Sequence, residues 1–495
     1  MDGQAVKRVV IAGGGTAGWT VAAALAKNLG SLLEISLVES DAIGTVGVGE
    51  STIPTARRFH ELLGIDERSF VCATQASFKL GIAFEDWAKI GDRYFHAFGV
   101  TGQSTWLADF HHVWLQAREQ GLAGEFGDYC LELQAAEAGK FEGGKGSRLN
   151  YAYHLDASAY GRFLRAFAEP LGVRRIEGKI AQVDLASDTG FIEALVLESA
   201  ERVAGDLFID CTGFRGLLIE EALATGYEDW THWLPTDSAL AVQTEATGPA
   251  RPYTRAIARP AGWQWQIPLQ KRVGNGLVFC SRYLSDDEAH AQLARQIEGA
   301  MLTDPRLIRF RAGTRRKAWN RNCIAIGLAS GFVEPLESTS IHLIMIAVTR
   351  LMQLFPFGGI SEALISRYNE VSRRELESIR DFIVLHYHLN ERDEEFWREC
   401  RTMDIPDTLA ERLALFRDAG HAYQAADELF RTDSWVQVML GQRLSPRGHH
   451  AMGRLMRPEQ LSAALANIAA NIDAAVARLP QHQTFLDRFC GHPSG

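Results

Sequence analysis

The feature that most constrains the fold is a glycine pattern directly after a short apolar strand near the N-terminus. Residues 9–11 predict the strand, and Gly13, Gly15 and Gly18 follow it with the spacing GxGxxG. The first glycine permits a tight turn, the second lets the backbone approach a pyrophosphate, and the third lets a helix pack closely on the strand. The turn residues that we expect to contact a dinucleotide are Gly13, Gly15, Thr16, Ala17 and Gly18.

The segments after this turn complete a dinucleotide-binding unit. Residues 19–28 predict a helix whose N-terminus faces the phosphates, and residues 35–38 predict a second strand that ends on Glu39. Glu39 follows Gly18 by about twenty residues, which is the spacing of the acid that binds a ribose hydroxyl. Strand, helix and acid in register therefore predict a Rossmann-like domain.

Two later segments favour FAD over a nicotinamide nucleotide. Residues 205–216, GDLFIDCTGFRG, and residues 323–335, CIAIGLASGFVEP, each run from an apolar strand into a glycine-containing turn. Two further strand-to-loop crossings are what an extended FAD-binding domain needs to cover both halves of the cofactor. Because the chain has no second complete GxGxxG unit, we expect a separate flavin reductase to supply the electrons.

The rest of the chain predicts a sheet-rich region followed by helices. Residues 173–215 and 238–283 show short β patterns, with Asn275–Gly276 as a hairpin signal. After these regions the apolar residues recur with helical spacing. We therefore expect an α/β fold, with a Rossmann-like FAD-binding domain and its sheet-rich insertions over residues 1–345 and a helical lobe over residues 346–495.

Charge and composition argue against several other classes of protein. A formal net charge of -10, without a run of basic residues, argues against binding to nucleic acid or to an anionic membrane. No stretch approaches the length of a membrane span, and the N-terminus lacks the apolar region of a secretory signal. The seven cysteines form no CxxC pair, so we interpret them as reduced packing residues of a cytoplasmic protein. No histidine or cysteine spacing indicates a metal site.

A lysine inside an apolar run is the most unusual single residue. Lys79 stands between Phe78 and Leu80 in QASFKLGIAF, residues 75–84. A buried lysine usually loses its proton, finds a carboxylate or reaches water along its stem. Taken alone, this stretch favours a lysine that snorkels from a half-buried strand, and only motifs elsewhere in the chain favour a functional role.

Three other stretches carry residue types that suit a site. Glu50 and Ser51 stand in the glycine-bracketed loop GVGEST soon after the nucleotide unit. Trp263 and Trp265 alternate in WQWQIP, and two tryptophans on one sheet face are more often core packing than a site. In residues 331–340, GFVEPLESTS, the ExST segment can simply cap the helix that follows.

Together these motifs resemble the tryptophan halogenase family of flavin-dependent halogenases, in chain order and over most of the length. The combination of WxWxIP with the lysine is specific to that family, whereas GxGxxG is not. In the family, the flavin domain oxidises halide and the helical lobe holds an aromatic substrate. The matching stretches are GGGTAGW (13–19), GVGESTxP (47–54), the SFKLG lysine, YFHAFG (94–99), YAYHLDA (151–157), WQWQIP (263–268) and FVEPLEST (332–339).

The resemblance implies a reaction and a role for the lysine. Reduced flavin and O2 would oxidise chloride or bromide to hypohalous acid. Lys79 would hydrogen-bond that acid or form a haloamine, so that the electrophilic halogen meets one carbon of the substrate. Glu337 would pair with Lys79 and would stabilise or deprotonate the cationic adduct. Backbone amides around Thr339 and Ser340 would bind the halide.

The resemblance assigns the remaining positions to the substrate and the cofactor. Trp263 and Trp265 match the pair that shapes the wall between the flavin and substrate chambers. His96 and Phe98 match the aromatic positions against which a flat substrate stacks. For both pairs, ordinary aromatic packing is the alternative. The cofactor contacts that we expect outside the glycine turn are Glu39, Glu50, Ser51, Val183, Leu328 and Ile341.

Two departures from the family pattern bear on the halide and the substrate. Ser340 stands where the family often has glycine, so a residue with a Cβ must fit the halide nest. In members that act on free tryptophan, the region matching residues 433–442 carries a tyrosine pair and an acid, whereas this chain has Trp435, Val436 and Gln442. A site without those polar partners does not select a zwitterion strongly. We therefore expect Trp435 to contact indole, a substituted indole or a larger indole- or phenol-containing compound.

Two other functions stay open at this point. A flavin monooxygenase that hydroxylates an aromatic compound uses reduced flavin and O2 without halide, and Lys79, Glu337 and WxWxIP argue against it. A flavoprotein without turnover binds FAD and a protein partner, and it forms no substrate-dependent product. A homodimer is expected only by analogy with the family.

Overall fold

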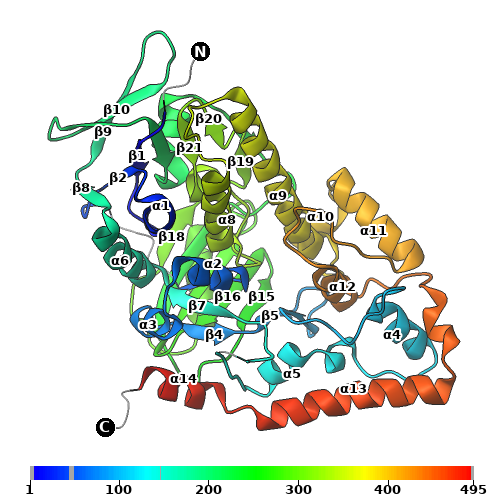
Figure 1. Cartoon of the computed structure of the whole chain (residues 1–495). Coiled ribbons are helices and arrows are strands. Elements are labelled where there is room, and N and C mark those ends of the chain that lie inside the picture. The colour runs from blue at the N-terminus through cyan, green and yellow to red at the C-terminus, as the bar shows by residue number, and fades with distance from the viewer. Residues whose placement is uncertain (1–4, 44–48, 145, 492–495) are drawn as a thin grey trace. The chain divides into compact units, whose positions relative to one another are not determined.

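The computed structural model describes residues 5–43, 49–144 and 146–491, and Figure 1 follows the chain by colour from its N-terminus to its C-terminus. The chain forms two compact units whose segments alternate along the sequence. The first unit takes in residues 1–76, 155–234 and 310–377, and the second takes in residues 77–154, 235–309 and 378–495. The expected domain boundary after residue 345 divides the chain by function and stays a prediction.

The first unit is built on a six-stranded sheet. Its strands are β1 (Arg8–Ala12), β2 (Glu34–Glu39), β8 (Arg174–Glu177), β12 (Leu207–Asp210), β20 (Trp319–Asn320) and β21 (Cys323–Ala325). Their order is β20-β21-β12-β1-β2-β8, and all neighbours are parallel except β20 and β21. The predicted Rossmann-like sheet is confirmed, with the two further crossings, β12 and β21, on one side of β1.

Helices and small sheets complete this unit. Helix α1 (Thr16–Leu29) connects β1 to β2 and packs against α6 (Ala157–Ala168) and α8 (Ser340–Gln353). Its alanine-rich centre is fully buried, and alanine is also the strongest helix former. The other elements are β3 (Gly49–Ser51), α2 (Thr55–Leu63), α3 (Glu67–Ala73), β9 (Ile180–Leu185), β10 (Ile192–Leu197), β11 (Arg202–Ala204), β13 (Tyr227–Asp229), β19 (Gly313–Arg315), β22 (Gly331–Phe332) and α9 (Glu362–His388), which continues into the second unit.

The second unit contains a seven-stranded sheet. Its strands are β5 (Gly81–Glu85), β6 (Arg93–Ala97), β14 (Ser238–Glu245), β15 (Thr254–Arg259), β16 (Gly262–Pro268), β17 (Arg272–Phe279) and β18 (Arg306–Arg309). In the order β18-β14-β17-β16-β15-β5-β6, only β15 and β5 are parallel neighbours. Lys79 lies in a separate strand, β4 (Ser77–Lys79), which pairs with β7 (Ala152–Asp156).

The hairpin predicted at Asn275–Gly276 is wrong, because both residues lie in the middle of β17. Gly276 pairs there with Trp265 of β16 and with Ala241 of β14. A Cβ on Gly276 would lie 2.0 Å from the indole ring of Trp265. The glycine therefore makes room for a tryptophan on the neighbouring strand, which is a tertiary requirement and not a turn.

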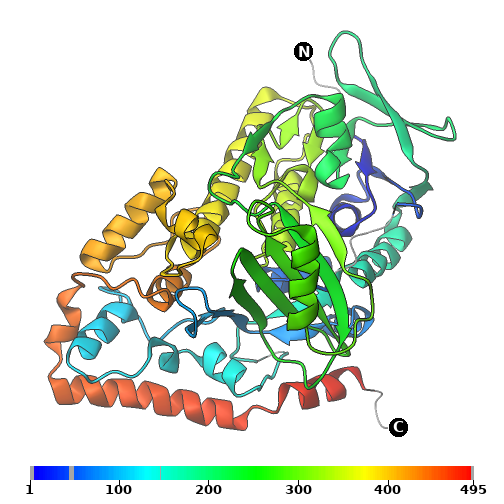
Figure 2. The ribbon, with the colours of Figure 1, turned by 180° about the vertical axis from the view of Figure 1, so that it is seen from behind.

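Helices form the rest of the second unit. They are α4 (Phe110–Glu119), α5 (Leu131–Glu137), α7 (Asp286–Gln296), α10 (Glu395–Thr402), α11 (Asp407–Ala419), α12 (Thr432–Gly441), α13 (Pro458–Arg478) and α14 (His482–Cys490). From Ser340 to residue 491 every regular element is helical, as predicted. Helix α13 runs along α4 and α5 (Figure 2), where Leu461 and Leu465 join Phe110 and Trp114 in one buried cluster.

Three expectations drawn from composition can be compared with the described residues. The free cysteines, all buried as predicted, are Cys130, Cys211, Cys280, Cys323 and Cys400. The prediction is wrong for Cys72 and Cys490, which are disulfide-bonded, because a disulfide needs proximity in the fold and not short spacing in sequence. No helix within residues 5–43, 49–144 and 146–491 is long and apolar enough to cross a membrane. In the same residues, no three His, Cys, Asp or Glu side chains are grouped so that they could hold a metal ion.

We expect Gly276→Ala to lower the stability of the protein by about 1–3 kcal/mol, because the new Cβ would overlap the Trp265 ring. The matched control is Gly248→Ala, since no described atom lies within 4 Å of a Cβ at Gly248. Thermal melting of both variants measures the difference. A Gly276→Ala protein that melts with the wild type would show that the indole can move aside without cost.

Candidate functional site

The glycine turn after β1 brings backbone atoms closer together than any larger residue would permit. A Cβ on Gly18 would lie 1.8 Å from the carbonyl oxygen of Gly13. Gly13 has a φ of 104°, and its Cβ would lie 2.4 Å from the carbonyl oxygen of Cys211. In contrast, no described atom lies within 4 Å of a Cβ on Gly15, so the backbone there is open to a ligand.

The N-terminus of α1 suits a phosphate group. Gly15 is its N-cap, no side chain caps the helix, and the first turn contains no acidic residue. Backbone N–H groups and the helix dipole therefore favour an anion at this point. Thr16 begins the helix, and its Oγ1 donates a hydrogen bond to the carbonyl oxygen of Ala157 at 3.4 Å.

Glu39 lies beside the glycine turn, at the end of β2. A Cβ on Gly14 would lie 1.5 Å from Glu39 Oε2. The carboxylate accepts hydrogen bonds from Arg175 Nε at 2.5 Å and from Trp19 Nε1 at 3.3 Å. These bonds orient the acid that the sequence predicts to bind a ribose. The sequence analysis missed Arg175, because it is 136 residues from Glu39 and carries no local signal.

The loops after β12 and β21 lie at the same edge of the sheet as the glycine turn. Asp210, the last residue of β12, accepts hydrogen bonds from Thr212 and from two backbone amides further along, which holds the first loop in shape. In the second loop, a Cβ on Gly327 would lie 3.0 Å from the Cβ of Ala17. This contact brings the segment that contains Leu328 to the start of α1.

Of the predicted cofactor contacts, Ile341 is a core residue and Val183 packs against the core. Val183, in β9, packs against the hydrophobic cluster that includes Val10 and Phe208. Ile341, in the first turn of α8, is almost fully buried. Both side chains therefore stabilise the packing of the first unit, whatever else they contact.

Glu50 lies in β3, next to the buried Ser51. The carboxyl group of Glu50 is partly buried, and this burial raises its pKa to about 7. A carboxyl group with a pKa near neutrality can change its protonation state over the pH range in which most enzymes work. Gly47 and Val48, which begin the same motif, lie outside the described residues.

The loop before α8 has a strained backbone. Glu334 and Ser338 have φ angles of 63° and 60°, a conformation that costs a non-glycine residue about 1–3 kcal/mol. Glu337 between them is buried. Thr339 is the N-cap of α8, and its buried Oγ1 has no hydrogen-bond partner among the described residues. Ser340 is already helical and has no positive φ, so its backbone does not require the glycine common in the family.

A buried polar chain fixes α8 behind this loop. Thr55 Oγ1 lies 2.9 Å from His342 Nδ1, and His342 Nε2 lies 3.4 Å from Glu375 Oε1. Arg350 Nη2 donates to the same carboxylate at 2.7 Å. Burial alone would raise the pKa of Glu375, but its bonds with His342 and Arg350 outweigh burial and hold that pKa below its usual value.

In the second unit, Lys79 is completely buried. Its exposed fraction is 0%, and it pairs with Ala152 of β7, so the snorkelling lysine is excluded. Lys79 Nζ lies 5.2 Å from the centroid of the Phe98 ring, which is a cation–π distance. His154, on the same strand pair, was not predicted. Its burial, reinforced by the charge of Lys79, holds the pKa of His154 well below its usual value, so the imidazole is neutral.

His96 is part of a group of rings that we call the aromatic cluster, formed by His96, Phe382, Phe430 and Trp435. The His96 centroid lies 5.4 Å from that of Phe382 and 6.0 Å from that of Phe430. Phe382 and Phe430 stack at 3.8 Å, and Trp435 meets Phe382 edge-on at 4.8 Å. Trp435 Nε1 is buried without a hydrogen-bond partner in the described part of the chain.

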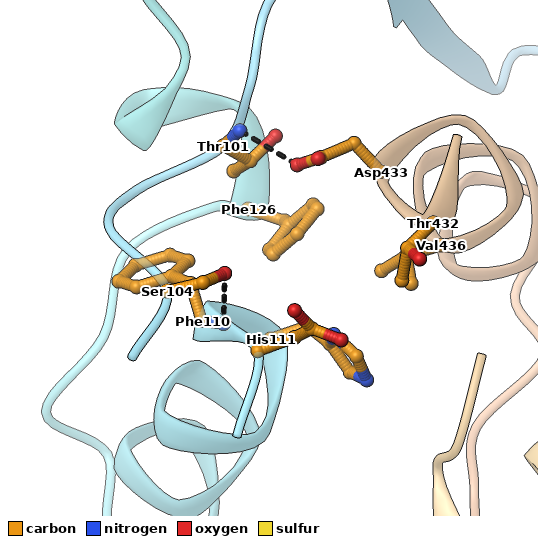
Figure 3. A pocket seen from close by; sticks show the side chains of 9 residues that line it. Thr101, Ser104, Phe110, His111, Phe126, Thr432, Asp433 and Val436 are labelled. Carbon is orange, nitrogen blue, oxygen red and sulfur yellow. Dashed lines mark hydrogen bonds between the residues drawn. The ribbon is translucent and has the colours of Figure 1, made fainter. Parts of the chain in front are cut away.

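Polar side chains of α12 are bound to backbone beside this cluster. Gln437 accepts a hydrogen bond from the Ala97 amide and donates to Thr101 Oγ1. Asp433 accepts from the Thr101 amide (Figure 3), and Gln442 donates to a backbone carbonyl of α9. The sequence analysis missed Arg412, whose guanidinium lies 4.0 Å from the centroid of the Trp435 ring.

Trp263 and Trp265 lie on one face of β16, as their alternation predicts. Both are buried, and their ring centroids are 6.0 Å apart. Trp263 also meets Trp87 at 6.3 Å, so it takes part in the aromatic packing of the second unit.

The predicted site residues therefore fall into two groups. The first unit holds the glycine turn, Glu39, Glu50, Ser51, Val183, Leu328, Glu337, Thr339, Ser340 and Ile341. The second unit holds Lys79, His96, Phe98, Trp263, Trp265 and Trp435. Within the first unit, the glycine turn, Glu39 and the loop that contains Leu328 lie close together. Within the second unit, Lys79 lies beside Phe98, and His96 and Trp435 both belong to the aromatic cluster.

Comparison with known proteins gives consistent matches over the whole chain. Residues 8–458 match the family model described as tryptophan halogenase. The structure is similar to Xcc4156, a flavin-dependent halogenase from Xanthomonas campestris, with 53% identity, a TM-score of 0.97 and coverage of 99% of this chain and 100% of that chain. BrvH, a flavin-dependent halogenase from Brevundimonas sp. BAL3, gives 45% identity, a TM-score of 0.94 and coverage of 98% and 99%. Tryptophan 6-halogenase SttH from Streptomyces toxytricini is 37% identical over 437 residues, which are 82% of this chain and 83% of that protein.

The raised pKa of Glu50 predicts a pH-dependent stability. Its neutral form is favoured in the folded state, so its contribution is complete below the ordinary pKa of 4.5 and is lost as the pH rises through about 7. We expect Glu50→Gln to unfold like the wild type at pH 4.5 and to be more stable by about 1–3 kcal/mol at pH 8. Urea unfolding of the cofactor-free protein at the two pH values measures this.

The control for this prediction is Glu198→Gln, which changes an exposed carboxylate of the first unit. It should shift the free energy of unfolding by a small amount that is the same at both pH values. A constant offset for Glu50→Gln as well would contradict the raised pKa.

Proposed function

Because this chain belongs to the tryptophan halogenase family and is a flavin-dependent halogenase, we propose that it halogenates an indole or a related aromatic compound other than free tryptophan. The halogen source would be chloride or bromide, and a separate flavin reductase in the cytoplasm would supply reduced FAD. The observation that carries the proposal is the aromatic cluster: Phe382 and Phe430 meet His96, and Trp435 meets Phe382 edge-on. The side-chain amides of Gln437 and Gln442 beside it are already hydrogen-bonded to backbone.

The first unit offers a binding site that fits the adenosine diphosphate half of FAD. The α1 N-terminus would hold the pyrophosphate, and Glu39, oriented by Arg175, would accept a ribose hydroxyl. The open backbone at Gly15 leaves room for the phosphates, and the loops after β12 and β21 would line the site further. When bound, reduced flavin would activate O2, and the activated oxygen would oxidise a halide ion to hypohalous acid.

We assign halide binding to the start of α8. The buried Thr339 hydroxyl has no described partner, and an unsatisfied buried donor costs about 1–3 kcal/mol, which an anion at this point would offset. Amides at the N-terminus of α8 would add further donors and a favourable dipole. The strained φ angles of Glu334 and Ser338 are consistent with a loop whose shape serves binding rather than stability.

We assign delivery of the halogen to Lys79. Its amine is completely buried beside the Phe98 ring, so it can hold hypohalous acid away from bulk water. The neutral His154 nearby leaves the ammonium without a second positive charge to repel it further. Glu337 is the carboxylate that we propose to accept the proton lost from the ring carbon on substitution.

The aromatic cluster would determine which substrates react. Stacked and edge-on rings suit the flat face of an indole. The guanidinium of Arg412, which lies 4.0 Å from the centroid of the Trp435 ring, is already paired with Glu428 at 2.7 Å. Burying both charges of a free amino acid there would leave them unpaired, which is costly. A neutral or substituted indole carries no such cost.

We expect the purified protein to halogenate indole when FAD, a flavin reductase, NADH, O2 and chloride or bromide are present. Mass spectrometry should show the isotope pattern of the halogen. Lys79→Met should lower the yield at least about 100-fold while reduced flavin is still oxidised, because the amine that directs the halogen is gone. The matched control is Lys89→Met, an exposed lysine of the same unit, which should keep full activity.

Three other results would contradict the proposal. A product that gains oxygen and no halogen would indicate an aromatic monooxygenase. Flavin oxidation without a product across a panel of aromatic compounds would indicate a flavoprotein without this activity. Equal halogenation by Lys79→Met and the wild type would remove the role assigned to the lysine.

Calorimetric titration should show that indole binds at least about tenfold more tightly than free tryptophan. The reason is that neither the ammonium nor the carboxylate of the zwitterion meets an unpaired opposite charge in the aromatic cluster. The comparison uses the same protein with FAD present, and titration with benzene gives the contribution of ring stacking alone. Free tryptophan that binds as tightly as indole would overturn the proposed substrate class.

A further inference from the structure

The motif YAYHLDA, residues 151–157, contains a buried histidine that has no role in the function proposed so far. His154 lies in β7, is completely buried and pairs directly with Ser77 of β4. Lys79 follows Ser77 by two residues, so both side chains point to the same face of β4. The residue opposite Lys79 on β7 is the small Ala152, and His154 is the diagonal neighbour of the lysine on that strand.

The hydrogen bonds of His154 fix its tautomer. Ser77 Oγ donates to the carbonyl oxygen of Pro268 at 2.5 Å, and it lies 3.1 Å from His154 Nδ1. A hydroxyl group has only one hydrogen, so Ser77 is the acceptor in its contact with the ring, and Nδ1 carries the proton. On the other side of the ring, Nε2 lies 2.9 Å from Thr254 Oγ1 and accepts the hydrogen of that hydroxyl. The imidazole is therefore held at both nitrogens in one neutral form.

These bonds connect the strand of the lysine to the large sheet of the second unit. Pro268 is the last residue of β16, the strand that carries the tryptophan pair, and Thr254 is the first residue of β15. The two strands are neighbours in the seven-stranded sheet. His154 therefore links β4 to that sheet through side-chain hydrogen bonds. Because the link ends on Ser77, a shift of the ring would shift the backbone that carries Lys79.

A second histidine holds the same strand by its backbone. His482 Nε2 accepts the amide hydrogen of Phe78 at 3.2 Å, and its Nδ1 donates to the carbonyl oxygen of Ala250 at 2.7 Å. Burial lowers the pKa of His482 to about 4 and outweighs the raising effect of the Ala250 carbonyl, so this ring is neutral as well. Lys79 and His482 are the two titratable groups whose charges would act on His154. Both histidines thus hold β4 without adding a positive charge beside the lysine.

We propose that His154 is a positioning residue for the halogenation reaction: through Ser77 and Thr254 it fixes the place of the Lys79 amine, so that the amine retains hypohalous acid instead of releasing it to solvent. This inference rests on the halogenase function proposed above and adds the residue that gives Lys79 its place. His154 acts through the lysine and does not need to contact the substrate. A misplacement of about 1 Å can lower a reaction rate about 100-fold, so a small shift of β4 is enough to affect the reaction.

The test replaces His154 with leucine, which has no polar atom, and with asparagine, whose side-chain amide can still donate to Ser77 Oγ. We expect His154→Leu to lower the yield of halogenated indole per reduced flavin oxidised at least about tenfold, while flavin oxidation keeps its wild-type rate. The missing halogen should appear as free hypohalous acid, which taurine in the solution traps as a haloamine. His154→Asn should recover most of the yield, because it keeps the bond to Ser77.

The matched control is His421→Leu, which changes an exposed histidine of the same unit and should leave both the yield and flavin oxidation unchanged. Two further variants keep the test decisive if His154→Leu does not fold. Ser77→Ala and Thr254→Val each remove one of the two bonds to the ring with little change in volume. Each should lower the yield per flavin about threefold.

Two results would overturn the positioning role and leave the halogenase function intact. The first is a wild-type yield per flavin in His154→Leu, or in both Ser77→Ala and Thr254→Val. The second is a loss of flavin oxidation in proportion to the loss of product, because it would show that the histidine only stabilises the fold.

A readout that does not depend on activity separates this inference from the proposed reaction. If the wild type halogenates no aromatic compound, the proposed reaction fails, and crystal structures of the wild type and of His154→Leu test the positioning role alone. The distance from Lys79 Nζ to the centroid of the Phe98 ring is 5.2 Å in the wild type. We expect it to change by about 1 Å or more in the variant, and an unchanged distance would overturn the role of His154.

Discussion

The first unit depends on the close approach of two backbone segments, at Gly13 and Gly18. The carbonyl oxygen of Gly13 lies where a side chain at position 18 would begin, so α1 starts directly against the end of β1. Several later elements of this unit pack beside that contact: α6 and α8 pack on α1, and β12 and β21 extend the sheet beside β1. No described side chain caps the N-terminus of α1, so the glycines that permit the packing also leave a helix end that suits a phosphate.

The second unit poses the opposite problem, because it must hold a charged amine away from water. Burying an ammonium group is expensive, and the surroundings of Lys79 reduce that cost in two ways: the Phe98 ring provides a cation–π contact, and His154 stays neutral. In the function that we propose, this buried amine would hold the reactive halogen beside an aromatic ring.

The sequence predicted those parts of the protein whose structure depends on residues that are near one another in the chain. The glycine turn, its helix and Glu39 were predictable because their spacing follows from a single βαβ unit. The prediction of a hairpin at Asn275–Gly276 was wrong because Gly276 makes room for the Trp265 ring on the neighbouring strand, and no local pattern reveals this contact. Phe382 and Phe430 were missed for the same reason. They are distant in sequence from His96, and a single phenylalanine in a sequence is normally interpreted as a core residue. The resemblance to a family supplied Lys79 and Glu337 as a pair, which the residues alone would not have joined.

The alternation of the two units along the chain has a consequence for biosynthesis. The first unit is complete only when residue 377 has been synthesised, which takes roughly 20–75 s at ordinary rates of translation. Until then β1, β2 and α1, which are synthesised first, leave apolar surface exposed. No single truncation of the gene separates the two units, because their segments alternate along the chain. A fragment that ends after β22 would lack α8 and α9. The ribosome-bound chain therefore passes through a long period before the core of this unit can close.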